Sequence, residues 1–273
     1  MHEVMLNGVV RFFIATALTA TLLLSSMLAG CLEGNLENDF VYVDEPVYES
    51  TNATIVEVWE DGEVVETTYP VLTFDFNNLS APSPFVFYTV RGTHVDETVD
   101  ATLTGTVEVE FKHHGLHTLE VMADYEDTPE EGEDESRHLN EVVVRIEKRI
   151  EWRESSTNDP LPMTLDTRHE VGEEPASVIV IESTVHNPEL INNIGGGQEV
   201  EVSWALIDGT QEACQSQPGK VDEGGSAVWK TVHFNTAEVH ELRVNYEEGQ
   251  DTIDVDHVVS IEYEHLESKP ASW

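Results

Sequence analysis

Three histidines lie close together in the first half of the chain, at His113, His114 and His117. Imidazole nitrogens are common zinc ligands, and two or three of them near one another could hold a zinc ion. His117 has a counterpart at His240 in a recurring sequence pattern, and no histidine pair precedes His240. We therefore expect His117 to be a framework residue and no metal to be bound, with these three histidines as the candidate ligands if one is.

Two groups of carboxylates are candidates for calcium, which prefers oxygen ligands. The first is the acidic run from Glu126 to Glu135, and the second comprises Asp251, Asp254 and Asp256. Neither group has the spacing of a calcium-binding loop. We expect a solvated hairpin tip at the first group and no cofactor in the protein, with calcium as the alternative.

The sequence contains no pattern that is typical of nucleophilic catalysis. It has no Gly-x-Ser-x-Gly, and His169-Glu170 lacks the second histidine of a zinc-protease helix. Paired carboxylates occur throughout so acidic a chain and indicate no particular site. We expect a protein that is not an enzyme. Cys214 is expected to be a small buried hydrophobic residue rather than a nucleophile.

Aromatic side chains offer another kind of binding site, because an exposed ring can stack on a sugar. Trp204 lies in an alternating apolar segment, and we expect it to fill the centre of a core. Trp59, beside a predicted hairpin tip, and Trp229 are the candidate ligand-binding residues. Packing in a core or against the hairpin is nevertheless the expected role of both.

The N-terminal residues 1–30 differ from the rest of the chain. Residues 12–30 carry no charge and follow a single cation, Arg11. A charged start, an apolar segment and small residues before a cleavage site are typical of a secretory signal peptide. The end of this segment resembles the lipobox of bacterial and archaeal lipoproteins. The matching residues are Leu28, Ala29, Gly30 and Cys31.

That resemblance implies a lipid on Cys31, which becomes the new N-terminus and holds an exported lipoprotein at the outer face of the cell membrane. The alternative is an uncleaved transmembrane helix, because residues 12–30 are just long enough to span a bilayer. In both cases we expect the rest of the chain to be extracellular, with residues 31–50 as an acidic stalk that leads away from the membrane.

The charge of the chain restricts its partners. Fifty-four acidic residues against thirteen basic ones give a formal net charge of −41. So negative a surface repels nucleic acids and anionic lipid head groups, and we expect neither as a partner. The acid excess also suits a salty medium, in which ions screen the self-repulsion. The hypothesis from charge is therefore a halophilic or marine organism, such as an archaeon.

Almost every segment after residue 50 has the alternation of a β-strand, and no long 3.6-residue period occurs. Asp61-Gly62 between two such segments predicts a hairpin, because that pair tolerates the positive φ of a tight turn. The sequence therefore predicts an all-β protein. The further strands are expected at 71–76, 85–90, 102–111, 119–125, 142–150, 178–185, 199–207, 227–234, 241–246 and 257–263.

An internal repeat predicts the number of modules. Val109-Glu-Phe111, five residues, then His117-Thr-Leu119-Glu-Val121 recurs as Val232-His-Phe234, five residues, then His240-Glu-Leu242-Arg-Val244. We expect two tandem β-sandwiches at 51–150 and 151–266, followed by a C-terminal tail at 267–273.

A second resemblance concerns the modules. The segment from Val202 to Thr210, with Trp204 and Asp208-Gly209, is similar to the strand-and-turn hallmark of polycystic-kidney-disease-type (PKD) repeats, which are immunoglobulin-like sandwiches. Phe234 to Val244 looks like their closing strands, and Leu72 to Asn78 takes the hallmark position in the first module. The resemblance implies spacer or interaction modules without catalytic residues.

These observations predict a non-catalytic, membrane-anchored surface lipoprotein that acts as a structural, adhesive or protein-interaction module. Its partner would be a surface protein or a glycan. The alternative is a carbohydrate- or small-ligand-binding module that serves a transporter or a hydrolase.

Overall fold

The computed structural model describes residues 46–81, 83–126, 137–189, 197–249 and 252–271 of the chain. Residues 44–273 form one compact unit, and the regular structure of the described residues is all β, as predicted. The strands are β1 (Val47–Tyr48), β2 (Asn52–Glu60), β3 (Glu63–Thr68), β4 (Val71–Asp75), β5 (Phe85–Gly92), β6 (Val95–Asp100), β7 (Thr106–Glu110), β8 (Gly115–Tyr125), β9 (Arg137–Thr157), β10 (Met163–Asp166), β11 (Val178–His186), β12 (Val200–Ile207), β13 (Ala213–Val221), β14 (Ser226–His233), β15 (Val239–Glu248) and β16 (Ile253–Glu262).

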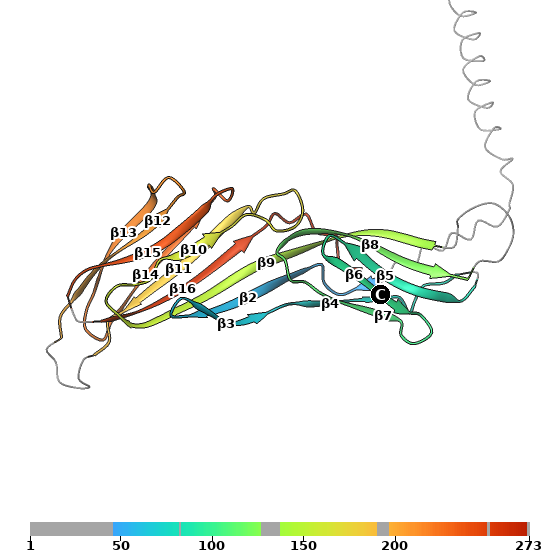
Figure 1. The fold of residues 1–273 in the computed structure, drawn as a ribbon, viewed down its shortest axis with the longest axis horizontal. Helices are drawn as coiled ribbons and strands as arrows, with labels where there is room; N and C mark the ends of the chain where they lie inside the picture. Colours follow the sequence, from blue (N-terminus) through green and yellow to red (C-terminus); the bar gives the residue numbers. More distant parts are fainter. Residues whose placement is uncertain (1–45, 82, 127–136, 190–196, 250–251, 272–273) are drawn as a thin grey trace, which may run out of the picture. The chain divides into compact units, whose positions relative to one another are not determined.

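The first hydrophobic core lies between a three-stranded sheet and four strands of a nine-stranded sheet (Figure 1). One sheet has the order β1-β4-β7, and the facing strands follow the order β6-β5-β8-β9. Alternation along the strands creates the two faces, since every second side chain points inward. Val107 and Val109 of β7 and Leu119 and Val121 of β8 are all buried in this way.

The second core lies between the sheet β10-β15-β12-β13 and the strands β14, β11, β16 and the C-terminal part of β9. Trp204 of β12 is fully buried in it, which confirms its predicted role. Its indole Nε1 donates a hydrogen bond to Ser183 Oγ at 2.7 Å, and His257 Nδ1 lies 2.8 Å from the same oxygen. Gly219 of β13 leaves room for the ring, because a Cβ there would lie 2.3 Å from Trp204 Cζ3.

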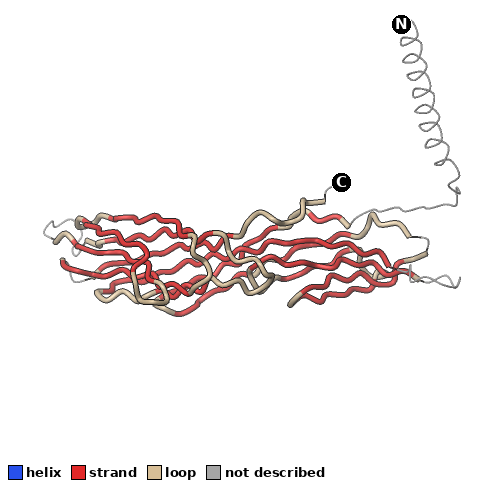
Figure 2. Tube along the Cα trace, turned by 90° about the horizontal axis from the view of Figure 1, so that it is seen from above, coloured by secondary structure: helices blue, strands red, loops and turns tan. Residues whose placement is uncertain are grey.

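One long strand, β9, contributes to both cores (Figure 1), and Figure 2 shows that the described residues are strands joined by loops. The first half of β9 pairs with β8 and its second half with β16, and β2 runs parallel to its middle. Val144 therefore faces the first core, and Trp152 faces the second. The module boundary expected between residues 150 and 151 lies inside this strand, so the backbone crosses it in one continuous ladder of hydrogen bonds.

The predicted hairpin at Asp61-Gly62 is present, with φ angles of 49° and 85° at the two residues. It joins β2 to β3, and its tip packs against the second core, whereas Ile55 near the start of β2 is buried in the first core. Trp59 stacks on Trp152 with ring centroids 5.6 Å apart; Trp152 belongs to the second core, and the partly buried Trp59 packs against it. The parallel pairing of β2 with β9 explains this position. The C-terminal end of β2 lies beside Trp152 and Arg153 of β9, which belong to the part of β9 that faces the second core.

Five consecutive strands repeat the same pairing pattern in the two halves. In the first, β4 pairs with β7, and β5 pairs with β6 and β8. In the second, β11 pairs with β14, and β12 pairs with β13 and β15. This equivalence corrects one sequence match: Leu72 lies on β4, the counterpart of β11, whereas Trp204 lies on β12, the counterpart of β5.

The sequence repeat is also one residue out of register before its turn. Val109 and Phe111 point into the first core, whereas Val232 and Phe234 point outward, with Phe234 76% exposed. The expectation that these residues are equivalent is wrong, because the connection between the strand and His240 contains one residue more than the connection before His117.

His233, not Phe234, takes the place of Phe111. The Phe111 ring meets the His117 ring edge-on at 5.0 Å, and the His233 ring meets the His240 ring in the same way at 4.7 Å. His117 Nε2 donates to the His113 carbonyl at 2.8 Å, and His240 Nε2 donates to the Asn235 carbonyl at 2.8 Å. The prediction that His117 and His240 are equivalent framework histidines is therefore confirmed.

The described part of the expected C-terminal tail is held against β9. Glu267 accepts two hydrogen bonds from Arg145, Nε to Oε2 and Nη2 to Oε1, each at 3.0 Å. These bonds lower the pKa of Glu267 to about 2. Ser268 adds two more contacts, since Val143 N–H donates to its Oγ at 2.9 Å and its own N–H donates to the Val143 carbonyl.

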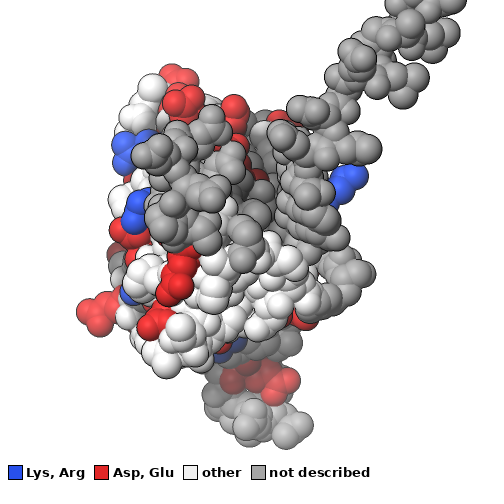
Figure 3. Space-filling model, turned by 90° about the vertical axis from the view of Figure 1, so that its right-hand side faces the viewer, with Lys and Arg blue, Asp and Glu red and all other residues white. Residues whose placement is uncertain are grey.

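Figure 3 shows how charge is distributed on one face of the molecule. Acidic side chains lie there both singly and in small groups, basic ones are fewer, and an uncharged area lies among them.

Candidate functional site

A groove of about 600 Å³ opens where the residues after β10 meet the connection between β14 and β15. We call it the junction groove, because it includes Lys148 from the middle of β9. Its remaining lining residues are Asp166, Arg168, His169, Glu170, Pro175, Thr236 and Ala237.

The two cations of the junction groove are each paired with an acid. Arg168 binds Asp166 through two hydrogen bonds, Nε to Oδ1 at 2.9 Å and Nη2 to Oδ2 at 2.6 Å. The bond from Arg168 is the main reason that the pKa of Asp166 lies below its ordinary value. Lys148 Nζ lies 2.7 Å from Glu57 Oε1. The groove therefore presents charged donors and acceptors at fixed positions with little net charge of either sign.

Glu170 joins the groove to the first half of the molecule. Its Oε2 lies 3.3 Å from His113 Nδ1 and accepts the backbone N–H of His114 at 3.3 Å. The backbone N–H of Glu170 donates in turn to the His114 carbonyl at 3.3 Å. Next to it, Gly115 forms a parallel bridge with Val171, and a Cβ on Gly115 would lie 2.2 Å from the Val171 carbonyl oxygen. The close backbone approach thus fixes where Glu170 points.

His114 lies buried beneath Glu170 and shares a 2.6 Å hydrogen bond between its Nδ1 and Tyr263 Oη. Burial lowers the pKa of His114 to about 4, although the nearby charge of Glu170 acts in the opposite direction. Burial, followed by the charge of Glu170, raises the pKa of Tyr263. Both rings are consequently neutral at neutral pH. They pack beside Glu170, with His114 Nε2 3.7 Å from Glu170 Oε1, and add no charge to the groove.

The opposite wall of the junction groove is held by threonine hydroxyls. Thr167 Oγ1 lies 3.1 Å from the Thr236 carbonyl and 3.0 Å from the Glu238 carbonyl. Thr236 Oγ1 donates to the Ala176 carbonyl. These contacts order the connection between β14 and β15, in which Phe234 lies exposed two residues before the groove wall.

No family model matches the chain, and no curated protein matches it. Solved structures that match part of the chain include carbohydrate-binding modules of the β-sandwich superfamily, at 6% identity over 78% of this chain and 95% of that one, with a TM-score of 0.26. A β-glucuronidase from Bacteroides uniformis is 10% identical over 80% of this chain and 30% of its own, with a TM-score of 0.26. An isomalto-dextranase from Arthrobacter globiformis T6 in complex with panose is 11% identical over 71% of this chain and 32% of its own, with a TM-score of 0.24. Likenesses this distant carry no argument about function.

The three predicted metal-ligand candidates do not converge on a point. His113 meets Glu170, His114 meets Tyr263, and His117 Nε2 is used by the His113 carbonyl. In the part of the chain that the structure describes, the group of side chains that could share a metal ion is a different one: Cys214, His233 and His240.

The sequence expectation for Cys214 is wrong, because the residue is exposed rather than buried. It follows the turn between β12 and β13, where the ladder between the two strands shifts its register. The spacing of Cys214, His233 and His240 in the sequence does not predict that they lie close together, because they belong to three different strands, β13, β14 and β15. If the repeat is aligned with one extra residue before His240, His233 falls opposite Phe111. That alignment would have placed His233 against the framework histidine His240.

The candidate aromatic platforms are not available for stacking. Trp229 is only 8% exposed and belongs to the second core. Trp59 is half-buried, stacks on Trp152, and donates from Nε1 to Glu57 Oε2 at 3.2 Å. The alternation of β14 explains the burial of Trp229, since it points inward between the outward-facing Val228 and Lys230.

The other candidates are partly outside the described residues. Residues 127–136 and Asp251 lie there, as do Leu28, Ala29, Gly30 and the predicted lipid-bearing Cys31. Asp254 Oδ1 accepts the backbone N–H of Ser156 at 2.8 Å, and Asp256 lies 3.8 Å from Arg153. Among the residues that the structure describes, no helix has the length and apolar character needed to cross a membrane.

Proposed function

We propose that the protein is a non-catalytic binding module, tethered to the outer face of the membrane through a lipid on Cys31, and that the junction groove takes a neutral polar ligand of the carbohydrate class. The observation that carries this proposal is the lining of the groove, where charged donors and acceptors are held in place and compensate one another.

Sugar hydroxyl groups both donate and accept hydrogen bonds, and they carry no charge. Arg168 and Lys148 supply donors, and Asp166 and Glu170 supply acceptors. Each group is already paired with another group of the protein, which restricts its orientation before a ligand binds. Phe234, two residues before Thr236 of the groove lining, is exposed and offers an aromatic face of the kind on which sugar rings stack.

The test is a glycan array probed with the full chain in detergent, followed by calorimetric titration of the strongest ligand. Arg168→Ala and Glu170→Gln should each weaken binding at least tenfold, which corresponds to about 1.4 kcal/mol. Arg91→Ala is the matched control, because Arg91 forms a comparable exposed ion pair with Asp96 on β5 and β6, away from the groove. Unchanged affinity in both groove variants would refute the assignment of the groove.

The tether is tested separately. The lipid on Cys31 predicts that the chain partitions into a detergent phase and that mass spectrometry finds Cys31 modified at the new N-terminus. Cys31→Ser should release the chain from the membrane if the anchor is the lipid. Retention of an uncleaved Cys31→Ser chain would instead support the transmembrane alternative.

A second candidate function is docking of a protein partner at β14, because exposed apolar side chains lie on and just after this edge strand. Val228 and Val232 point outward on either side of Lys230, and Phe234 follows the strand, with exposed fractions of 50%, 44% and 76% for the three apolar residues. Exposed apolar side chains that gather in one place often mark an interaction site. Cross-linking on intact cells tests it: Val228→Thr should reduce capture of a protein partner and leave binding in the junction groove unchanged.

A further inference from the structure

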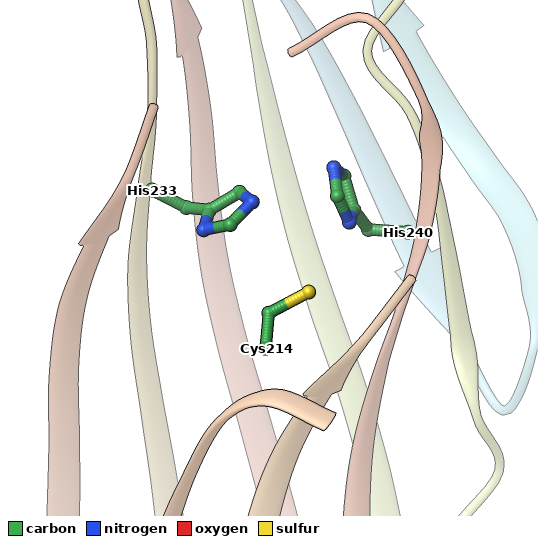
Figure 4. Close-up of side chains that lie close together, drawn as sticks. All are labelled: Cys214, His233 and His240. Carbon is green, nitrogen blue, oxygen red and sulfur yellow. The ribbon is translucent and has the colours of Figure 1, made fainter. Parts of the chain in front are cut away.

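Three side chains of metal-ligand type meet between β13, β14 and β15. Cys214, His233 and His240 each offer one ligand atom, and these three atoms lie within 4.8 Å of one another. Figure 4 shows the two rings turned toward each other and the thiol of Cys214 directed at the space between them. A bound zinc ion with Zn–S and Zn–N bonds of roughly 2.3 and 2.0 Å in tetrahedral geometry needs ligand atoms roughly 3.3–3.5 Å apart. Small side-chain rotations would bring the group to that separation.

The hydrogen bonding of His240 leaves one ring nitrogen ready to bind a metal. His240 is 1% exposed, and its Nε2 must carry the proton because it donates to the Asn235 carbonyl. In the neutral ring the lone pair is then on Nδ1, which has no hydrogen-bond partner among the described residues. Metal-bound histidines typically donate their other ring N–H to a carbonyl in this way, which fixes the tautomer.

His233 contributes a second buried nitrogen. Its Nε2 is likewise without a hydrogen-bond partner among the described residues. The edge-on contact with His240 holds this ring beside the other two ligand-type groups. Buried nitrogens without a hydrogen-bond partner are energetically unfavourable, and a bound ion would satisfy both of them.

The first half of the molecule provides an internal comparison. His117 has the same hydrogen bond from Nε2 and the same unpartnered Nδ1 as His240, so this feature alone belongs to the framework. Around His117, however, the facing ring is Phe111, which cannot bind a metal. The second half replaces that phenyl ring by His233 and adds an exposed thiol from Cys214. In the second half, two residues of metal-ligand type, His233 and Cys214, therefore lie beside the framework histidine His240.

We propose that Cys214, His233 and His240 form a binding site for a thiophilic transition-metal ion of the zinc or copper(I) type, with one coordination position open to solvent. A thiolate with two imidazoles suits these ions better than calcium or magnesium, which prefer oxygen ligands. The exposure of Cys214 gives the ion a route to the buried nitrogens.

The charges around the site set the proton balance. Asp208 and Glu238 are acidic groups near the Cys214 thiol. An ordinary cysteine thiol, with a pKa of about 8.5, is mostly protonated at neutral pH. Binding forms the metal–sulfur bond, breaks the S–H bond and releases one proton to solvent, while both imidazoles bind as neutral groups. The carboxylates of Asp208 and Glu238 then offset the charge of the bound cation.

The test is titration of the full chain, purified in detergent under reducing conditions, with Co(II) as a spectroscopic probe. One Co(II) per chain should bind, with a thiolate-to-cobalt charge-transfer band that disappears on addition of Zn(II). A parallel titration with Cu(I) against a competing chelator distinguishes the two ions, and tighter binding of either one assigns the site to it. Failure of Co(II), Zn(II) and Cu(I) to bind at micromolar concentration would overturn the proposal.

Variants locate the ion. Cys214→Ser should abolish the charge-transfer band, and His233→Phe should weaken metal binding at least tenfold. His233→Phe is expected to fold, because Phe111 occupies the same position in the first half. If His233→Phe does not fold, the result for Cys214→Ser decides, because Cys214 is exposed and its substitution leaves the core unchanged. His186→Ala, which removes an exposed histidine bound to Ser226, is the control and should leave the titration unchanged. A band that persists in both Cys214→Ser and His233→Phe would also overturn the proposal.

Discussion

The stability of the fold should fall on mild acidification through the buried His257. This residue lies at the centre of the second core beside Ser183, and burial lowers its pKa from 6.5 to about 4. Between these two values the unfolded chain binds a proton that the folded chain does not, so the free energy of unfolding rises with pH. The stabilisation is complete above pH 6.5 and is lost as the pH falls toward 4. For one such group, the loss between pH 7 and pH 5 is about 2 kcal/mol.

The measurement must separate His257 from the many carboxylates. Their mutual repulsion weakens as they become protonated, which stabilises the folded chain and partly offsets the histidine effect. His257→Asn keeps an amide near the position of Nδ1, so that Ser183 retains a partner, and it removes the titrating group. Urea unfolding of both proteins at pH 7 and pH 5 gives two differences in stability, and the carboxylate contribution cancels between them. The natural protein should lose about 2 kcal/mol more than His257→Asn. An excess loss below about 0.5 kcal/mol would refute the reasoning, because it would mean that His257 reaches solvent in the folded state.

Two further predictions concern the same core. Ser183→Ala leaves the Trp204 indole N–H and the facing imidazole nitrogen without their shared partner, and we expect a loss of about 2–6 kcal/mol in urea unfolding, given about 1–3 kcal/mol for each unsatisfied group. A loss below 1 kcal/mol would contradict the importance of this contact. Gly219→Ala places a Cβ against the Trp204 ring and should lower the melting temperature clearly, because overpacking costs about 1–3 kcal/mol. Gly209→Ala is its control, since a Cβ there meets nothing within 4 Å; equal effects of the two substitutions would refute the explanation.

The all-β class and the hairpin at Asp61-Gly62 could be predicted from sequence because they depend on local properties. Alternation of apolar residues and the turn preference of one dipeptide act over a few positions. The shared strand β9 could not be predicted, because its second half pairs with β16, about a hundred residues later in the chain. Both halves of β9 look like ordinary strand, and only tertiary pairing shows that they are continuous.

The register of the repeat illustrates a second limit. Val232 and Phe234 match Val109 and Phe111 in residue type, and an apolar match is a natural choice for equivalent positions. A shift by one residue moves a strand's apolar set to the opposite face, and Trp229 reveals the true parity of β14, because it is the large side chain that reaches the core. Residue type was therefore a poorer guide than the position of the bulkiest buried ring.

This shift of one residue also explains why the candidate metal site was overlooked in the sequence. With Phe234 taken as the partner of the framework histidine, His233 becomes an outward-facing residue of no interest. In the structure, His233 packs against His240 as Phe111 packs against His117, with nearly the same ring distance and angle. A position that needs only a flat ring for packing can accept either phenylalanine or histidine, since the edge-on contact is available to both. The exchange of one flat ring for another therefore adds a metal ligand while the packing of the framework stays the same.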